Sequence, residues 1–353
     1  MPRPGLRGFD FAPRRQITVS SYAAAVLKKG QDTSPRLARG VSGIMDTKPK
    51  VSVVVSFLNA ERFLEEAIES VFAQSFKSWE LLLVDDGSSD SSSAIAGRYS
   101  TAHPDIVKYL EHPDHRNRGL PASRNLGIGS AVGEYIALLD SDDVWLPNKL
   151  ERQVAILDSH RGVGMVYGVP QYWCSWEVRT TGAQPDYVEP PGVATNRVYP
   201  PPVLLKLMLS GQANAPCPSD WLFRREIFTK LGGFAETFSA VSNMYEDQAF
   251  LAKVYLHLPV FVSDECWDRY RIHPNQLCAR TIRGGKQPTA TVFYLNWITQ
   301  YLSSQGAFDA ETKDIIRRRL WPYHHPILYR LKQAGLRVGR KGKLFWGEPG
   351  RKK

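Results

Sequence analysis

Short apolar runs alternate with amphipathic segments through the first half of the chain. Five runs are rich in Val, Leu, Ile and Tyr and have the length of buried strands. They lie at residues 51–56, 79–84, 106–111, 135–139 and 164–169. Between the first two, apolar residues from Phe63 to Phe72 recur at i, i+3 and i+4 spacing, which predicts a helix that opens at Asn59. Further helices are predicted up to Ala102 and at 120–132 and 147–159.

The alternation of strands and helices predicts an α/β fold with a mixed, mostly parallel central sheet flanked by helices. After Gln171 the pattern loosens, and the proline-rich stretch 180–202 is predicted to be a loop. Beyond it we expect a strand at 221–223 and edge strands at 261–262 and 267–272. Helices are expected at 203–209, 225–231 and 246–256. From Thr289 the chain is predicted to form a helical C-terminal extension that Pro322 and Pro326 interrupt.

Positive charge is concentrated at the two ends of the chain. The 353 residues carry a formal charge of +10, but residues 1–50 carry +7 and residues 315–353 carry +11, so the middle is acidic. This distribution argues against a uniform nucleic-acid binder. Two interpretations of the basic ends stay open: contact with an anionic membrane surface, or solvated tails. For 315–333, a helix packed on the catalytic body competes with a membrane-bound helix.

Several classes of protein are excluded by what the chain lacks. No window approaches the roughly 18–20 apolar residues of a membrane-spanning helix, and residues 1–18 lack the apolar core of a secretion signal. The four cysteines form no CxxC pair, so we expect buried, reduced thiols rather than a zinc site. We therefore expect a cytoplasmic protein, with peripheral contact at the inner face of the membrane as an open alternative.

Polar and acidic residues follow three of the predicted strands. These strand ends carry Ser56, the pair Asp85 and Asp86, and the run Asp140-Ser-Asp-Asp143. Ligands of open α/β sheets bind beyond the carboxyl ends of strands. So many carboxylates require compensation by a cation, a metal ion or raised pKa values. Asp140 and Asp142 suit Mg²⁺ or Mn²⁺, although the same run could simply cap the next helix.

The order of several motifs resembles family 2 glycosyltransferases. The resemblance begins at Val51-Ser-Val-Val-Val-Ser56 and continues through Trp79-Glu-Leu-Leu-Leu-Val-Asp-Asp-Gly-Ser-Ser-Asp90. It goes on through Leu120-Pro-Ala-Ser-Arg-Asn-Leu-Gly127 and Gly133-Glu-Tyr-Ile-Ala-Leu-Leu-Asp-Ser-Asp-Asp143. It is dense over residues 50–157 and sparser through Gly232-Gly-Phe234, Glu246-Asp247 and Tyr270-Arg-Ile-His-Pro274.

The resemblance implies a GT-A fold and a domain organisation. It implies a catalytic domain at 49–280, with a nucleotide-binding half at 49–157 and an acceptor half at 158–280. A basic, flexible arm at 1–48 and a basic helical extension at 281–353 would flank it. The processive members carry a Gln-x-x-Arg-Trp motif that this chain lacks, so a non-processive enzyme is expected.

The resemblance also implies roles for individual residues. Ser56 and Asp86, with Asp85 and Asp140, are expected at the donor nucleotide. Arg124 is expected either to brace the acidic loops or face donor phosphate, or to pair with Asp85 or Asp86.

Asp142, with Asp140, is expected to bind Mn²⁺ or Mg²⁺. Asp247 is the expected general base, with Glu246 as competitor, because a helix start favours an anion there. Arg271 and His273 are expected on a loop over the donor phosphates.

The implied activity is metal-dependent, inverting transfer of a sugar from a nucleotide-diphosphate donor, with a UDP-sugar favoured. The acceptor would be a hydroxyl of a glycan or lipid-linked molecule in cell-surface polysaccharide synthesis. The alternatives are a non-catalytic glycosyltransferase-like scaffold and a nucleotidyltransferase.

Overall fold

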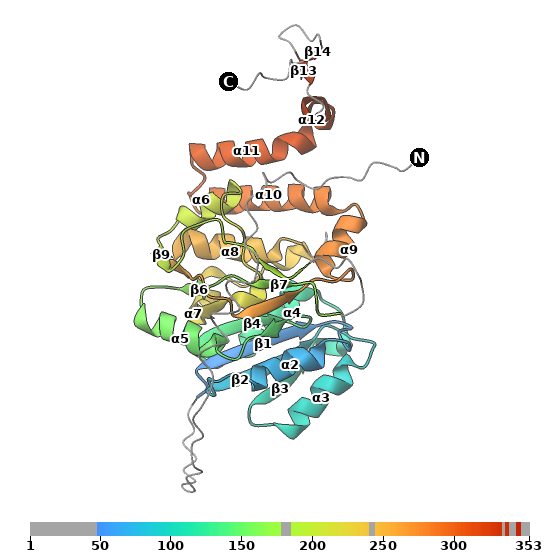
Figure 1. Ribbon diagram of the computed structural model, residues 1–353, viewed down its shortest axis with the longest axis vertical. Helices are drawn as coiled ribbons and strands as arrows, with labels where there is room; N and C mark the ends of the chain where they lie inside the picture. Colours follow the sequence, from blue (N-terminus) through green and yellow to red (C-terminus); the bar gives the residue numbers. More distant parts are fainter. Residues whose placement is uncertain (1–47, 178–184, 240–243, 334–335, 339–343, 347–353) are drawn as a thin grey trace.

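The computed structural model describes residues 48–177, 185–239, 244–333, 336–338 and 344–346. The predicted arm at 1–48 lies outside these residues except for Lys48, and so does most of the basic C-terminal tail after Gln333. The described part forms a layered α/β structure (Figure 1).

The core of the fold is an eight-stranded mixed sheet in the order β3-β2-β1-β4-β10-β6-β11-β9. Its strands are β1 (Val51–Phe57), β2 (Trp79–Asp85), β3 (Val107–Glu111), β4 (Tyr135–Asp140), β6 (Met165–Tyr167), β9 (Arg197–Tyr199), β10 (Leu222–Arg224) and β11 (Val260–Val262). The first four strands are parallel, and β10 runs antiparallel to both neighbours. The predicted mixed, mostly parallel sheet is confirmed.

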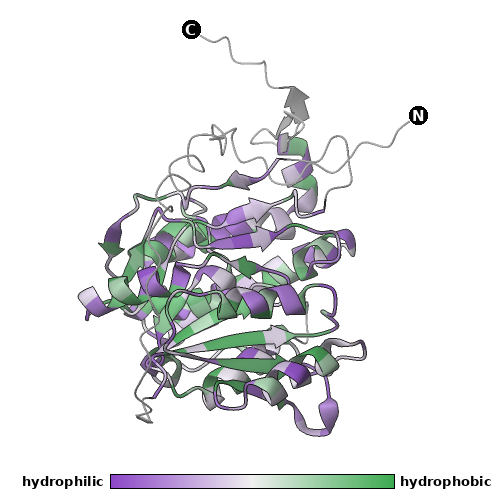
Figure 2. Ribbon diagram, turned by 60° about the horizontal axis from the view of Figure 1, so that its bottom comes forward, coloured by the Kyte–Doolittle hydropathy of each residue, from purple (hydrophilic) through white to green (hydrophobic). Residues whose placement is uncertain are grey.

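Helices cover both faces of this sheet because its central strands are apolar on both sides. In β1, Val53 and Val55 pack on one face and Val54 on the other. The first face carries α2 (Leu64–Phe72), α3 (Ser92–Ala102) and α5 (Lys149–Ser159). The second carries α4 (Leu120–Ser130), α6 (Val203–Leu209), α7 (Glu226–Leu231), α8 (Glu246–His257) and α10 (Gln287–Ser304). Figure 2 shows these strands as mostly hydrophobic.

Helix α2 begins later than the sequence pattern predicts. Asn59 has a left-handed backbone, with φ of 51°, and its side-chain oxygen accepts a hydrogen bond from the Ser89 amide at 2.7 Å. The Ala60 amide donates to the Ser92 hydroxyl at 2.8 Å. These bonds to the loop after β2 and to the first residue of α3 compete with helix formation, so residues 59–63 form a turn instead.

A second sheet has four short strands in the order β5-β12-β7-β8. They are β5 (Val144–Trp145), β7 (Gln171–Trp173), β8 (Tyr187–Val188) and β12 (Asp268–Arg271). Strands form where they were predicted, at 261–262 and 267–272, but their predicted edge position was wrong, because β11 lies between β6 and β9 and β12 between β5 and β7. The predicted loop at 180–202 contains β8 and β9 as well.

The C-terminal part is helical, as predicted, with α9 (Leu277–Arg283), α10, α11 (Ala310–His324) and α12 (Pro326–Gln333). A short β13 (Leu336–Val338) and β14 (Leu344–Trp346) follow. Three 3₁₀ turns complete the described elements, at Pro113–His115, Pro218–Asp220 and Glu236–Phe238.

Helices α10 and α11 lie successively outside α8 (Figure 1). Pro322 does not interrupt the helix as expected, because α11 continues through it to His324 although a proline cannot donate the backbone hydrogen bond of that position. Pro326 does mark a break, since α12 begins there. Of the predicted alternatives for 315–333, α11 packs on the body through buried Ile316. No helix among the described residues combines the length and apolarity that crossing a membrane requires.

Candidate active site

A cavity of about 850 Å³ opens where the carboxyl ends of β1, β2 and β4 meet the start of α8. This volume lies toward the upper end of the roughly 300–1,000 Å³ typical of ligand sites. Predicted site residues from distant parts of the sequence line it together: Ser56, Asp86, Arg124, Asp140, Asp142, Glu246, Asp247 and His273. Of the predicted set, Asp85 and Arg271 are not in this lining.

Ser56 and Asp86 both line the cavity, and they differ in the hydrogen bonds that their side chains form. The Ser56 hydroxyl is buried and has no hydrogen-bond partner among the described residues. The Asp86 carboxylate accepts hydrogen bonds from the backbone amides of Arg118 and Gly119, at 2.7 and 3.0 Å. Asp85 is fully buried and faces away, because it accepts hydrogen bonds from the Ser88 amide and the Ser93 hydroxyl. Asp85 therefore supports the loop after β2 rather than lining the cavity.

Arg124 supplies the positive charge that the clustered carboxylates require. Its guanidinium is only 3% exposed and forms ion pairs with Asp140 at 2.7 Å and Glu246 at 3.1 Å. The expected alternative, a pair with Asp85 or Asp86, was wrong, because α4 directs Arg124 toward β4 and α8 instead. Burial would lower the pKa of Arg124, but the carboxylates of Asp140 and Glu246 raise it above its usual value. Arg124 thus joins the end of β4 to the start of α8.

The turn after β4 presents Asp142 to the cavity and buries Asp143. The Asp142 carboxylate contacts His273 Nε2 at 2.9 Å. The Asp143 carboxylate accepts hydrogen bonds from the Ser219 hydroxyl at 2.6 Å and the Arg271 amide at 2.9 Å. Ser219 also accepts from the Asp140 amide at 3.0 Å. Burial raises the pKa of Asp143 well above its usual value, and the neighbouring Asp142 and Asp140 raise it further.

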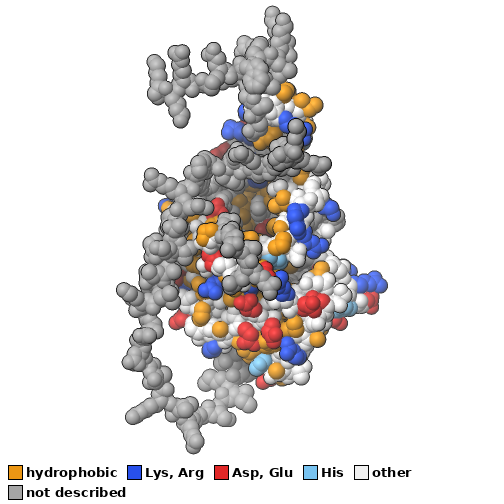
Figure 3. All heavy atoms as spheres, turned by 45° about the vertical axis from the view of Figure 1, so that its right-hand side comes forward, with side chains coloured by type: hydrophobic (Ala, Val, Ile, Leu, Met, Phe, Trp, Pro, Cys, Tyr) orange, Lys and Arg blue, Asp and Glu red, His pale blue; other side chains and the backbone are white. Residues whose placement is uncertain are grey.

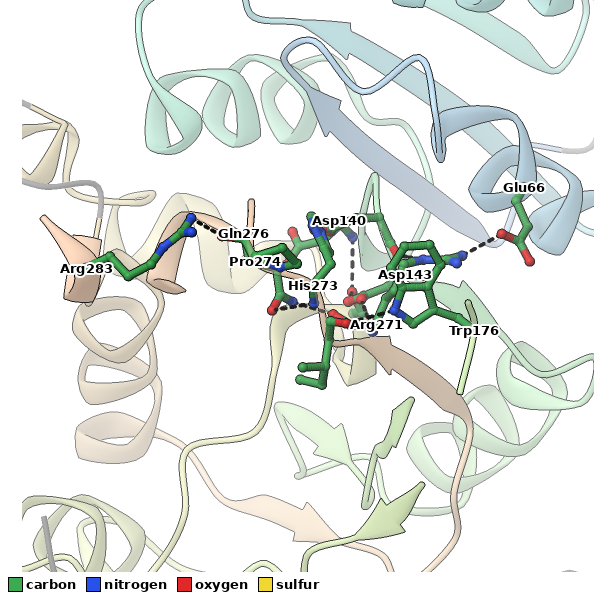
Figure 4. A network of polar contacts seen from close by, with 12 residues as sticks. Glu66, Asp140, Asp143, Trp176, Arg271, His273, Pro274, Gln276 and Arg283 are labelled. Carbon is green, nitrogen blue, oxygen red and sulfur yellow. Dashed lines mark hydrogen bonds and ion pairs between the residues drawn. The ribbon is translucent and has the colours of Figure 1, made fainter. Parts of the chain in front are cut away.

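Arg271 joins three segments behind this turn (Figure 4). Its side chain donates to the Asp142 carbonyl at 2.6 Å and pairs with Glu66 at 2.5 Å. The guanidinium also lies against the rings of Trp173 and Trp176, at 4.5 and 5.1 Å from their centroids. Arg271 is the last residue of β12 and is 2% exposed, so the expectation that it lies on a loop was wrong. His273, two residues later, lies beyond the strand and lines the cavity.

Glu246 and Asp247 begin α8 in an environment that favours their neutral forms. Burial, followed by the charge of Asp247, raises the pKa of Glu246 to about 8 despite the ion pair with Arg124. Burial also raises the pKa of Asp247. The expected preference of the helix start for an anion is outweighed here by burial. Glu246 is held in the ion pair with Arg124, whereas the Asp247 carboxylate accepts a hydrogen bond from the neighbouring Gln248 amide at 2.7 Å.

The carboxylates of the cavity fit a divalent cation only if a bound substrate supplies further oxygen atoms to the cation. In the described part of the chain, no three His, Cys, Asp or Glu side chains form a cluster that could hold a metal ion. Asp140 and Asp142 still offer carboxylate oxygens to the cavity beyond their contacts with Arg124 and His273. Mg²⁺ is commonly held by one or two carboxylates together with substrate phosphates, and this arrangement meets that pattern.

Several residues of the site had no role assigned from sequence. Asp143 belongs to the acidic run but received no function, and Glu66 was one of many acidic residues on a predicted helix. Ser219 carried no sequence signal at all. The cysteines also differ from expectation: all four are free, but Cys278 is exposed and the others are only partly buried.

Two proteins with sequence similarity to this chain are named as glycosyltransferases. A putative glycosyltransferase, EpsE of Bacillus subtilis, is 43% identical over 127 residues, which are 35% of this chain and 45% of EpsE. WfgD of Escherichia coli, a UDP-Glc:alpha-D-GlcNAc-diphosphoundecaprenol beta-1,3-glucosyltransferase, is 35% identical over 118 residues, 33% of this chain and 44% of WfgD. The chain thus spans less than half the length of these curated relatives.

Solved structures share the fold at low sequence identity. S. aureus TarS 1-349 in complex with UDP-GlcNAc has a TM-score of 0.55 at 18% identity, covering 86% of this chain and 98% of that one. The mannosyltransferase PcManGT of Pyrobaculum calidifontis, in complex with GDP-Man and Mn2+, has a TM-score of 0.50 at 18% identity, covering 89% and 85%. These likenesses concern the fold, which is of the GT-A type. The family model for glycosyl transferase family 2 matches residues 52–232, more than half of the sequence, and the chain therefore belongs to that family.

Proposed function

We propose that this protein is an inverting glycosyltransferase that moves a sugar from a nucleotide-diphosphate donor to a hydroxyl of a glycan or lipid-linked acceptor. The observation that carries the proposal is the convergence of Ser56, Asp86, Asp142 and Asp247 on one cavity. We further propose a role in cell-surface polysaccharide synthesis, since WfgD is a glucosyltransferase that acts on GlcNAc-diphosphoundecaprenol, a lipid-linked sugar. The site lies in a domain that we propose to extend over residues 49–280.

The donor nucleotide is proposed to occupy the end of the cavity at Ser56 and Asp86. The unpartnered Ser56 hydroxyl supports this placement, because a buried polar group without a partner costs free energy unless a ligand satisfies it. A UDP-sugar is favoured because TarS, a neighbour in fold, binds UDP-GlcNAc. The diphosphate would then lie near Asp140 and Asp142.

Asp142, together with Asp140, is proposed to hold Mn²⁺ or Mg²⁺ with the donor diphosphate. When bound, such a cation neutralises charge on the leaving nucleotide diphosphate. His273 fixes the Asp142 carboxylate through the 2.9 Å contact, and Arg124 fixes Asp140. Arg271 is now proposed to hold the turn in place, and only His273 retains a proposed role near the donor phosphates.

Asp247 is proposed to be the general base. The acceptor hydroxyl attacks the anomeric carbon as its proton passes to the Asp247 carboxylate. The bond from the anomeric carbon to phosphate breaks on the opposite face, and its electron pair leaves with the nucleotide diphosphate. Glu246 is less suited, because it is buried against Arg124. The raised pKa of Asp247 makes it a stronger base than an ordinary aspartate.

Thermal unfolding with UDP, GDP, CDP and dTDP, each with and without Mn²⁺, tests the donor site. A ligand at about 100 times its dissociation constant stabilises by about 2.7 kcal/mol, which is a shift of several degrees. Asp142→Asn should remove the Mn²⁺-dependent part of the shift, whereas the exposed Asp105→Asn should not. Absence of any shift in wild-type protein would refute the proposed donor site.

Turnover measurements test the base. Asp247→Asn should reduce turnover by roughly 10²–10⁴ with donor affinity unchanged. Weaker donor binding at normal turnover would instead assign Asp247 to the donor site.

We also propose peripheral contact of the C-terminal helices with an anionic membrane from the cytoplasmic side. In α12, Ile327 and Leu328 are 72% and 41% exposed, beside the basic Arg330 and Lys332. Figure 3 shows hydrophobic and basic side chains together at this end of the described chain. Apolar side chains among basic ones suit an anionic lipid surface. Ile327→Asp should weaken co-sedimentation with phosphatidylglycerol vesicles, and equal binding to neutral vesicles would contradict the proposal.

A further inference from the structure

Three tyrosines form a row across the second sheet. Tyr270 of β12 pairs in register with Tyr172 of β7, and Tyr172 pairs with Tyr187 of β8. The rings of Tyr172 and Tyr187 are stacked, with centroids 4.8 Å apart and planes 3° apart. Tyr270 meets Tyr172 edge-on, at 5.5 Å. Because paired residues of neighbouring strands lie on the same side, all three side chains share one face of the sheet.

This face is the one that turns toward the active site. Side chains alternate along a strand, and the next pair in register, Arg271 and Trp173, packs together on the other face with its centroid contact of 4.5 Å. Tyr270 and Tyr172 both line the main cavity. Tyr172 also lines a second, small cavity with Glu189 and Asn214. The row therefore leads out of the active site, with Tyr187 beyond the lining residues.

The phenol hydroxyls of the row are available to a ligand. None of the three has a hydrogen-bond partner among the residues that the structure describes, and none is a fully buried atom. Burial raises the pKa of each phenol, so all three are neutral and can both donate and accept hydrogen bonds. A tyrosine offers an apolar ring edge and a polar tip together, which matches the alternating C–H and O–H groups of a sugar.

The row begins next to the reacting groups. The Arg271 amide, one residue after Tyr270, donates to Asp143 in the turn that carries Asp142. A ligand on the row would therefore have one end at the carboxylates and would extend outward over Tyr172 to Tyr187. A donor sugar is a single unit and needs no such track, whereas an oligosaccharide does. All three tyrosines also belong to the half of the domain expected to bind the acceptor.

We propose that Tyr270, Tyr172 and Tyr187 form the acceptor subsite, which binds successive sugar units of a neutral glycan. This inference rests on the proposed glycosyltransferase function and names the ligand class of its second substrate. Tyr270 contacts the unit that reacts, and Tyr187 contacts a unit farther from the reacting end. The subsite selects by hydrogen bonds to sugar hydroxyls and by contact with ring edges.

Fluorine NMR of the whole chain labelled with 3-fluorotyrosine tests the subsite directly. The probes are cellobiose, maltose, lactose and chitobiose at roughly 50 mM, with UDP and Mn²⁺ present, which detects dissociation constants into the mM range. We expect at least one disaccharide to shift the resonances of the row, assigned with single Tyr→Phe variants. The resonance of Tyr301, on α10 and hydrogen-bonded to His257, should not move. Row resonances that stay unchanged with all four sugars would overturn the proposal.

Tyr172→Phe should weaken the binding of the responding disaccharide about threefold to tenfold, the usual effect of one lost hydrogen bond. The matched control Tyr301→Phe should leave the dissociation constant unchanged. An unchanged dissociation constant in Tyr172→Phe would overturn the role of its hydroxyl. If that variant fails to fold, the resonance shifts of the wild-type protein decide whether the subsite binds the sugar.

Nucleotide-induced thermal shifts separate the subsite proposal from the proposed function. Stabilisation by UDP with silent tyrosines refutes only the subsite, whereas no nucleotide effect refutes the proposed function itself.

Discussion

Replacement of Arg124 by methionine should show how strongly the site depends on one buried cation. The guanidinium is 3% exposed and pairs with Asp140 and Glu246. Methionine keeps most of the apolar stem but leaves two carboxylates without their counter-charge. Removal of one partner from a buried ion pair typically costs about 3–5 kcal/mol. Asp140 is 25% exposed and loses little, so most of this cost falls on Glu246.

The loss of unfolding free energy in Arg124→Met should depend on pH, because Glu246 changes its charge within the accessible pH range. The pKa of Glu246 is raised to about 8 in the folded protein, so its neutral form is favoured, and stability is lost as pH rises from about 4.5 toward 8. Arg124 limits this rise, and its removal therefore raises the pKa of Glu246 further. Above pH 8 the wild-type loss is complete, but the variant continues to lose up to about 1.4 kcal/mol per pH unit.

Urea unfolding at pH 6 and pH 9, with the same m-value required of both proteins, provides the assay. We expect Arg124→Met to cost about 1–2 kcal/mol at pH 6, where Glu246 is largely protonated, and about 2–3 kcal/mol at pH 9, because the loss specific to the variant begins near pH 8 and amounts to at most about 1.4 kcal/mol by pH 9. In the Glu246→Gln background, Arg124→Met should cost the same free energy of unfolding at pH 6 and at pH 9. A cost below about 1 kcal/mol at pH 9, or one that does not change with pH, would refute this account of the buried charges.

Two further predictions concern stability away from the cavity. The Lys206 and Thr312 contacts lower the pKa of Asp309 to about 2, so its contribution is present above pH 3.8 and is lost as pH falls through 2. Asp309→Asn should therefore destabilise at pH 7 by up to about 1 kcal/mol in urea titrations and have a much smaller effect at pH 2, and a pH-independent effect would contradict this. A Cβ at Gly168 would lie 2.3 Å from the Glu265 carbonyl oxygen, so Gly168→Ala should lower the melting temperature. An unchanged melting temperature would show that this contact relaxes freely.

Sequence periodicity predicted the long, strongly apolar elements of the fold well. The strands that became β1, β2 and β4 are continuous apolar runs, buried on both faces, and few other structures suit such runs. By contrast β5, β7, β8 and β12 have two to four residues each, too few to show a period. Their pairing depends on contacts between distant segments, which no local pattern records.

The site was predictable by residue type but not by orientation. The ordered motifs identified Ser56, Asp142 and Asp247 as candidate site residues, and all three line the cavity. Asp85 and Arg271 face away because neighbouring hydroxyls, amides and aromatic rings satisfy them there. The residues that surround Arg271 are remote from it in sequence. A sequence motif shows that a charged residue is present, but it does not show which residues surround that charge in the fold.

The complete burial of the middle of α8 gives the two sides of the site different mechanical properties. Residues 249–252 are four consecutive positions without exposed surface, which places the helix between the main sheet and α10. A helical turn enclosed in this way has no exposed side from which to open, so the amides of residues 249–252 should exchange with solvent only when the whole domain opens. Asp247 therefore stands on a fixed support, whereas Asp142 stands on a turn. If the site adjusts to substrates of different size, the turn that carries Asp142 and the segments in contact with it must move, while Asp247 keeps its position.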